Sequence, residues 1–225
     1  MAHAAITTPA GVSGSRRTKQ TATVLAWAGI VALAVGFVLK YVVFYYRHYD
    51  AASFDPYWPR RGWLFLHING GTLALLTGPT QFWTGLRRRN LTFHRWMGRL
   101  FLVGVAMGVT GSVGLAVTTT NGWAFEAGLM GLALAWATTT AMAYVSIRKR
   151  LIDVHKQWMI RAYVVTFAFV TFRYLQEYSP LSRLRPEHDR DITIAWACWV
   201  VPLAVTEMVF HLRQIKTALT ARQSG

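Results

Sequence analysis

The chain has 225 residues, of which 53% are hydrophobic and only 15% are charged. Soluble domains average about 45–50% apolar and about 25% charged residues, so this composition argues against a soluble protein. The net charge of +15 would suit nucleic-acid binding, but the basic residues cluster between long apolar stretches, which is the pattern of membrane topology instead.

Six apolar stretches of about 20 residues follow one another, each long enough to cross a bilayer as a helix. They cover residues 24–46, 63–83, 97–117, 124–147, 158–178 and 192–212. A soluble helical bundle, the alternative class, would need polar faces that "FLVGVAMGVTGSVGLAV" lacks. We therefore predict an all-α fold, a polytopic bundle of six transmembrane helices in one domain over residues 21–215. Residues 1–20 are expected to form a disordered tail and residues 216–225 a short second tail.

The distribution of lysine and arginine predicts the orientation of these spans. If the N-terminus lies inside, the inner segments carry sixteen basic residues and the outer loops six. Loops rich in lysine and arginine stay in the cytoplasm. We therefore predict a multi-pass protein of the inner (cytoplasmic) membrane with both termini cytoplasmic. Its predicted partners are the bilayer and the anionic lipids of the cytoplasmic face, and no nucleic acid.

Two of the inner loops repeat one pattern, "RRRNLTFHRW" and "RKRLIDVHKQW". In each, a histidine (His94 or His155) follows seven residues after the first of three basic residues, and a Trp-Met pair follows the histidine. This predicts a duplicated helical hairpin, spans two–three and four–five, related by an axis along the membrane normal. Positive-inside topology with an aromatic belt is the alternative origin of the pattern. The basic residues concerned are Arg87, Arg88, Arg89, Arg148, Lys149 and Arg150.

The segments "HINGGTLALLTGPTQF", "HRWMGR" and "HKQWMIRAYVVTFAFVTFRY" resemble a predicted membrane protein family, domain of unknown function 2306. The resemblance covers residues 67–173. It implies a bacterial helical membrane protein with His67, His94 and His155 in the motif positions of the family. It implies no activity.

Charged residues also lie within the predicted spans. A charge at mid-bilayer costs about 2.5–3.5 kcal/mol on insertion scales, so it should face the bundle and be paired. By depth, Glu207 matches Arg161, and Arg173 lies level with an outer group that includes Glu177. Glu177 follows Arg173 by four residues, the spacing of a same-face pair. Structural ion pairs are the default interpretation, and a proton or substrate relay is the alternative.

Three functions are compatible with these features, and the sequence leaves open whether the protein is an enzyme. The best specific hypothesis is a haem b protein moving electrons, because bis-histidine haem needs two imidazoles on facing helices and His94 with His155 could supply them. His67, expected at the opposite membrane face, could not share their iron. The alternatives are a module binding an anionic headgroup or phosphate through the two basic loops, and a structural or assembly subunit without catalysis. No metal site is assigned: one cysteine excludes a thiolate zinc site, and no "HExxH" supports hydrolysis. A metal held by imidazoles at the inner mouth stays open.

Overall fold

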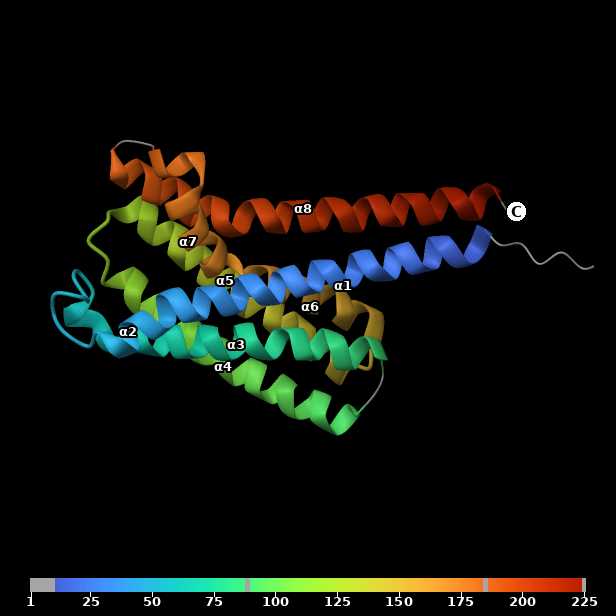
Figure 1. Cartoon of the computed structure of the whole chain (residues 1–225), viewed down its shortest axis with the longest axis horizontal. Helices are drawn as coiled ribbons and strands as arrows, with labels where there is room; N and C mark the ends of the chain where they lie inside the picture. Colours follow the sequence, from blue (N-terminus) through green and yellow to red (C-terminus); the bar gives the residue numbers. More distant parts are fainter. Residues whose placement is uncertain (1–10, 88–89, 184–185, 224–225) are drawn as a thin grey trace, which may run out of the picture.

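The computed structural model of the chain describes residues 11–87, 90–183 and 186–223, and within them every regular element is a helix. The elements are α1 (Gly11–Phe37), η1 (Val38–Val42), α2 (Val43–Arg47), η2 (Trp58–Arg60), α3 (Arg61–Arg87), α4 (Leu91–Val117), α5 (Trp123–Arg148), α6 (Ile152–Thr166), α7 (Ala168–Tyr178), η3 (Pro180–Arg183) and α8 (Glu187–Gln223). The first three are continuous, and α6 continues into α7 through Phe167. The long elements therefore form a bundle of roughly parallel and antiparallel rods (Figure 1).

Four of the described helices are long and apolar enough to cross a membrane. They are Thr21–Arg47, Leu91–Val117, Trp123–Arg148 and Glu187–Gln223. α3 is also 27 residues long, but polar residues such as Asn69 and Gln81 lower its hydropathy. α6 and α7 have 15 and 11 residues, so neither reaches the required length alone. The all-helical class is confirmed, and the count of six spans stays a prediction.

The start of α1 and the end of α8 lie at the same end of the bundle as the C-terminal ends of α3 and α5, and we call this the terminal end (Figure 1). The opposite end, formed by residues 48–60, 118–122 and the loop before α8, is called the distal end. α1 begins at Gly11, so residues 11–20, expected to be disordered, are helical. Extending an existing helix costs far less than starting one, and no proline interrupts these residues. Residues 1–10 lie outside the described part.

The hairpin of α3 and α4 is held together by glycines. A Cβ atom built on Gly70 would lie 2.3 Å from the Gly108 nitrogen and 2.5 Å from the Gly104 oxygen. The two backbones therefore touch, which only small residues permit, and such contact drives helix association in lipid. α4 begins after Asn90, a left-handed residue with φ 55° whose side chain accepts a 3.2 Å hydrogen bond from Phe93 N.

The second hairpin, α5 and α6, is joined by a short turn in which Arg150 adopts φ 61°. Deep in the bundle, Trp136 of α5 donates a 2.8 Å hydrogen bond to the hydroxyl of Thr166, the last residue of α6. Tyr163 of α6 donates to the Leu75 carbonyl of α3 at 3.2 Å, so the two hairpins are also bonded to each other. Both hairpins turn at the terminal end (Figure 1). A common orientation is what a duplication requires, and the duplication itself stays a prediction.

Candidate functional site

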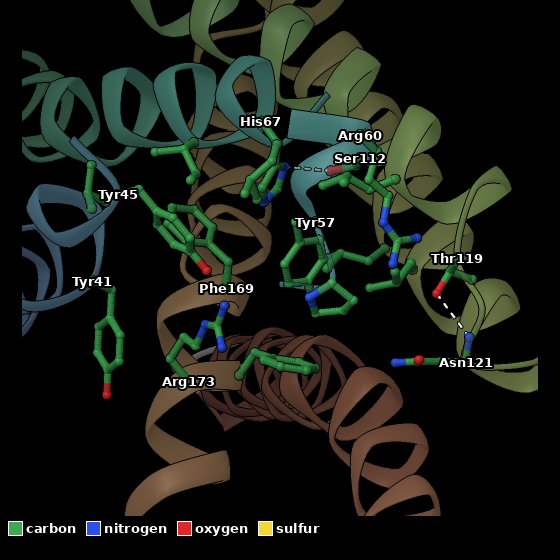
Figure 2. A pocket seen from close by; sticks show the side chains of 18 of the residues that line it. Tyr41, Tyr45, Tyr57, Arg60, His67, Ser112, Thr119, Asn121, Phe169 and Arg173 are labelled. Carbon is green, nitrogen blue, oxygen red and sulfur yellow. Dashed lines mark hydrogen bonds between the residues drawn. The ribbon is translucent and has the colours of Figure 1, made fainter. Parts of the chain in front are cut away.

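A cavity of about 170 Å³ lies at the distal end. It is lined by α3, α4, α5, α7, the segment before α3 and the continuous rod of α1, η1 and α2, which we call the first rod. Its walls are mostly apolar, with Phe37, Phe125, Phe169 and Phe172 among them. Its polar lining consists of Tyr41, Tyr45, Tyr57, Arg60, His67, Thr72, Ser112, Thr119, Asn121 and Arg173. Figure 2 labels all of these polar residues except Thr72 and shows them around a common space. A few polar groups on apolar walls are typical of small-molecule sites.

His67 is held on the cavity wall by α4. Its Nδ1 atom lies 3.2 Å from the Gly108 carbonyl oxygen and 2.8 Å from the Ser112 Oγ (Figure 2). A carbonyl can only accept, so we assign the proton to Nδ1, which leaves the lone pair on Nε2. Gly111 allows α4 to lie this close to His67, because a Cβ atom there would lie 2.4 Å from the His67 backbone nitrogen. His67 is thus an oriented imidazole with one ring nitrogen engaged.

Arg173, on α7, extends into the cavity from the side opposite His67 (Figure 2). Its Nη1 atom donates a 3.2 Å hydrogen bond to the side chain of Gln176. Among the residues that the structure describes, Arg173 has no carboxylate partner. The nearest acidic group in its network is Asp191, which accepts a 3.1 Å hydrogen bond from Gln176 and pairs with Arg190 at 3.0 Å. The cavity therefore contains a cation for which the described part of the chain supplies no counter-ion.

Arg173 does not pair with Glu177, which was one of its candidate partners in the outer group together with His67 and Glu126. The Glu177 carboxylate is bound by Lys40 of η1 and by the hydroxyl of Tyr41. Lys40 also donates a 2.6 Å hydrogen bond to Tyr178. The sequence could not predict this, because spacing by four residues places two side chains on one helix face but does not decide which neighbouring helix supplies a better partner.

An aromatic cluster in the segment before α3 closes the distal side of the cavity. Phe54 is 0% exposed, and its ring centroid lies 5.0 Å from that of Tyr45 and 5.8 Å from that of Trp58. Asp50 fixes the start of the turn by accepting two 2.8 Å hydrogen bonds from Ser53, and these bonds hold the pKa of the Asp50 carboxyl below its usual range. The packed segment brings Tyr57 over the cavity.

The repeated histidines lie at the terminal end, away from this cavity, and each ring is bonded to the first helix of its own hairpin. His94 Nδ1 lies 2.9 Å from the Thr84 hydroxyl oxygen, and that hydroxyl already donates to the Thr80 carbonyl at 2.7 Å. His155 Nδ1 lies 2.8 Å from the Ala143 carbonyl oxygen. Both rings therefore donate through Nδ1 and keep their lone pair on Nε2.

The basic loops beside these histidines are only partly described. Arg88 and Arg89 lie outside the described residues, and of Arg87 only the backbone is described. Arg148 donates a 2.9 Å hydrogen bond to Tyr144, and Lys149 and Arg150 are exposed. Headgroup binding by these loops stays a prediction.

Glu207 and Arg161, which the sequence places at one depth, form a two-point ion pair between α8 and α6. The distances from Arg161 Nε and Nη2 to the two carboxylate oxygens are 2.5 Å and 2.8 Å. The guanidinium carbon also lies 4.6 Å from the Trp158 ring centroid and 4.7 Å from that of Phe210. Charge and ring contacts together hold the cation in place.

The fold and its apolar helices define a polytopic helical membrane protein. The family model described as "Predicted membrane protein (DUF2306)" matches residues 64–210, and the chain belongs to this family. The resemblance noted for residues 67–173 is thereby confirmed. No curated protein and no solved structure matches the chain.

Sequence reasoning missed most of the cavity. It singled out His67 and Arg173 but not Tyr41, Tyr57 or Ser112, which line the same space. One signal was available: the stretch from residue 41 to residue 58 holds eight aromatic residues among eighteen. Such density at the end of an apolar span indicates either an interfacial belt or a packed cap, and the structure shows a cap.

Proposed function

We propose that the protein is a membrane-embedded binding protein for a small anionic molecule with an apolar body, held in the distal cavity. The observation that carries the proposal is Arg173, a cation without a counter-ion facing apolar walls. Arg173 is partly buried within the bundle, and a charge inside a membrane protein is costly unless it is paired. A ligand carboxylate or phosphate would supply the partner, and the planar guanidinium suits both.

The size of the cavity supports a ligand, or a ligand head, no larger than one small ring. A dry cavity of about 150 Å³ in another protein holds benzene, and this one measures about 170 Å³. Ring-on-ring contacts with Phe169 and Phe172 would stabilise an apolar body. The Nε2 lone pair of His67 would accept a hydrogen bond from a hydroxyl or a protonated group on the ligand.

We expect benzoate to bind the purified protein at pH 7 and neutral benzamide to bind far more weakly, measured by titration calorimetry in detergent. Replacing Arg173 with glutamine should weaken benzoate binding about tenfold or more, because a hydrogen bond to a charged group contributes about 1.5–3 kcal/mol. Arg173→Lys should retain part of the affinity.

Arg183→Gln is the matched control, since it removes one exposed charge at the same end of the bundle. Its benzoate affinity should equal that of the unaltered protein. Equal affinities for benzoate and benzamide, or equal losses in the two arginine variants, would refute the proposal.

A second candidate function is haem binding at the terminal end, favoured by the tautomers of His94 and His155. Each ring donates Nδ1–H to its own hairpin and keeps Nε2 as a donor atom for a metal, the usual arrangement behind a ligating imidazole. When bound, haem would supply one-electron transfer. The two histidines would hold it, and their hairpins would fix the ring orientations.

Protein expressed with a haem precursor should then show a Soret band whose reduced-minus-oxidised spectrum disappears in both His94→Ala and His155→Ala. His67→Ala should leave that spectrum unchanged, since His67 lies in the distal cavity. A colourless preparation that takes up no added haem would remove this candidate.

We propose, from the asymmetry of lysine and arginine, that the terminal end is cytoplasmic in the inner membrane and meets anionic lipids there. A reporter fused after Glu126 should read extracytoplasmic and one fused after Lys149 cytoplasmic. The reverse pattern would place the cavity on the cytoplasmic side.

A further inference from the structure

A second hollow of about 290 Å³ lies beside the distal cavity, lined by Lys40, Tyr41, Phe44, Tyr45 and Arg173. Three of these residues, Tyr41, Tyr45 and Arg173, also line the cavity. The two hollows therefore share a wall at Arg173. We call the second one the lateral recess.

The lateral recess opens on the flank of the bundle, between the first rod and α7. Phe44, which lines the recess but not the cavity, is 41% exposed, and the side chain of Lys40 is 45% exposed. Both belong to a candidate membrane span, Thr21–Arg47, and only 11% of its apolar 18-residue window is buried inside the bundle. In a membrane this flank faces lipid.

The first rod changes its winding at the recess. Val38–Val42 forms a π-helix, whereas the residues on either side are α-helical. Single π-turns inside α-helices are frequent at functional sites. Here the turn carries Lys40 and Tyr41, the two residues that bind Glu177 of α7 and so tie the first rod to α7 beside the recess.

We infer that the anionic group bound at Arg173 is the head of a single-chain lipid, which enters through the lateral recess from the membrane leaflet at the distal end. The inference rests on the proposed function. The cavity accepts a ring-sized head, so a longer apolar chain has to remain in the recess and the bilayer. Carboxylate and phosphate heads meet the same guanidinium chemistry.

Charge pairing directs the head past the rim of the recess to its inner wall. Lys40 is already neutralised by Glu177, whereas Arg173 has no carboxylate partner among the described residues. An incoming anion is therefore stabilised more strongly by the charge of Arg173 than by that of Lys40. The chain behind it would pass Phe44 and Tyr45.

Photo-crosslinking in lipid nanodiscs tests this route. Phe44 is replaced by the photoreactive amino acid p-benzoylphenylalanine, and deuterated dodecanoate, dodecyl phosphate or dodecanol is added before illumination. Leu33, on the same rod and 46% exposed, is the control position. Attached chains are identified by the mass of the labelled peptide.

The two anionic probes should label position 44 at least about fivefold more than position 33, equivalent to a preference of about 1 kcal/mol. Dodecanol should show no such preference. Benzoate or Arg173→Gln should reduce labelling at position 44 to the level at position 33. Which anion labels more strongly identifies the head group.

The inference is overturned if benzoate binds in an Arg173-dependent manner but labelling at position 44 equals that at position 33. In that case the distal cavity takes a small molecule and not a lipid. If benzoate fails to bind and labelling at position 44 is the same with and without Arg173→Gln, the proposed function itself is refuted.

Discussion

Replacing Gly70 with alanine is expected to destabilise the protein more than any single surface substitution. The new Cβ atom would lie 2.3 Å from the backbone nitrogen of Gly108 and 2.5 Å from the Gly104 oxygen. Backbone atoms inside a helix cannot move aside as a side chain can, so α3 and α4 would have to separate. Overpacking of this kind costs about 1–3 kcal/mol, and we expect the upper part of that range.

Gly29→Ala is the matched control, because a Cβ atom there meets nothing within 4 Å. Alanine in a helix is favoured over glycine by about 0.5–1 kcal/mol, so this variant should be as stable as the unaltered protein or slightly more stable. Thermal unfolding in detergent, followed by circular dichroism, measures both. A Gly70→Ala variant that melts with the unaltered protein would show that the glycine contact does not hold the hairpin.

The separation of α3 and α4 in Gly70→Ala should also alter the wall of the distal cavity. His67 lies one turn before Gly70, and its ring is bonded to Ser112 and the Gly108 carbonyl of α4. The glycines thus serve packing and also position the imidazole.

The arrangement of rods was predictable because hydropathy and the clustering of basic residues are properties of whole segments and do not depend on single side-chain contacts. Each predicted span falls within a helical rod of the structure. The start of α1 was not predictable, because helix ends depend on local cooperativity more than on composition.

The cavity was not predictable because it depends on side-chain choices between partners. Lys40 binds Glu177, and that single preference leaves Arg173 to face the cavity. The histidine repeat shows the opposite case. Its spacing predicted a shared role, and in the structure the Nδ1 atom of each histidine bonds to the preceding helix, His94 to the Thr84 hydroxyl and His155 to the Ala143 carbonyl. The reduced-minus-oxidised haem spectrum tests whether the two histidines share a ligand.

Replacing Glu207 with glutamine is the second change with a large expected effect. The substitution keeps the side-chain shape but removes the charge that pairs Arg161, whose side chain is 14% exposed between two aromatic rings. Removing one partner of a buried ion pair costs about 3–5 kcal/mol, whereas exposed pairs contribute about 0–1 kcal/mol. The Glu207 side chain is 50% exposed in the isolated chain, so we expect about 2 kcal/mol.

Asp153→Asn is the matched control for this variant. Asp153 is also paired with a cation, Lys156, at 2.9 Å, but its side chain is 88% exposed. Water compensates a lost charge there, so the free energy of unfolding should fall by less than about 0.5 kcal/mol. Both values come from denaturant unfolding of the purified protein in the same detergent.

A double replacement separates a pair that stabilises the bundle from one that only avoids an unpaired charge. Arg161→Met with Glu207→Leu removes both charges and keeps apolar volume between Trp158 and Phe210. If the loss in Glu207→Gln comes from the uncompensated guanidinium, the double variant should recover most of it. If the double variant is as unstable as Glu207→Gln, the ion pair itself joins α6 to α8. If Glu207→Gln costs no more than Asp153→Asn, the pair does not contribute to holding these helices together.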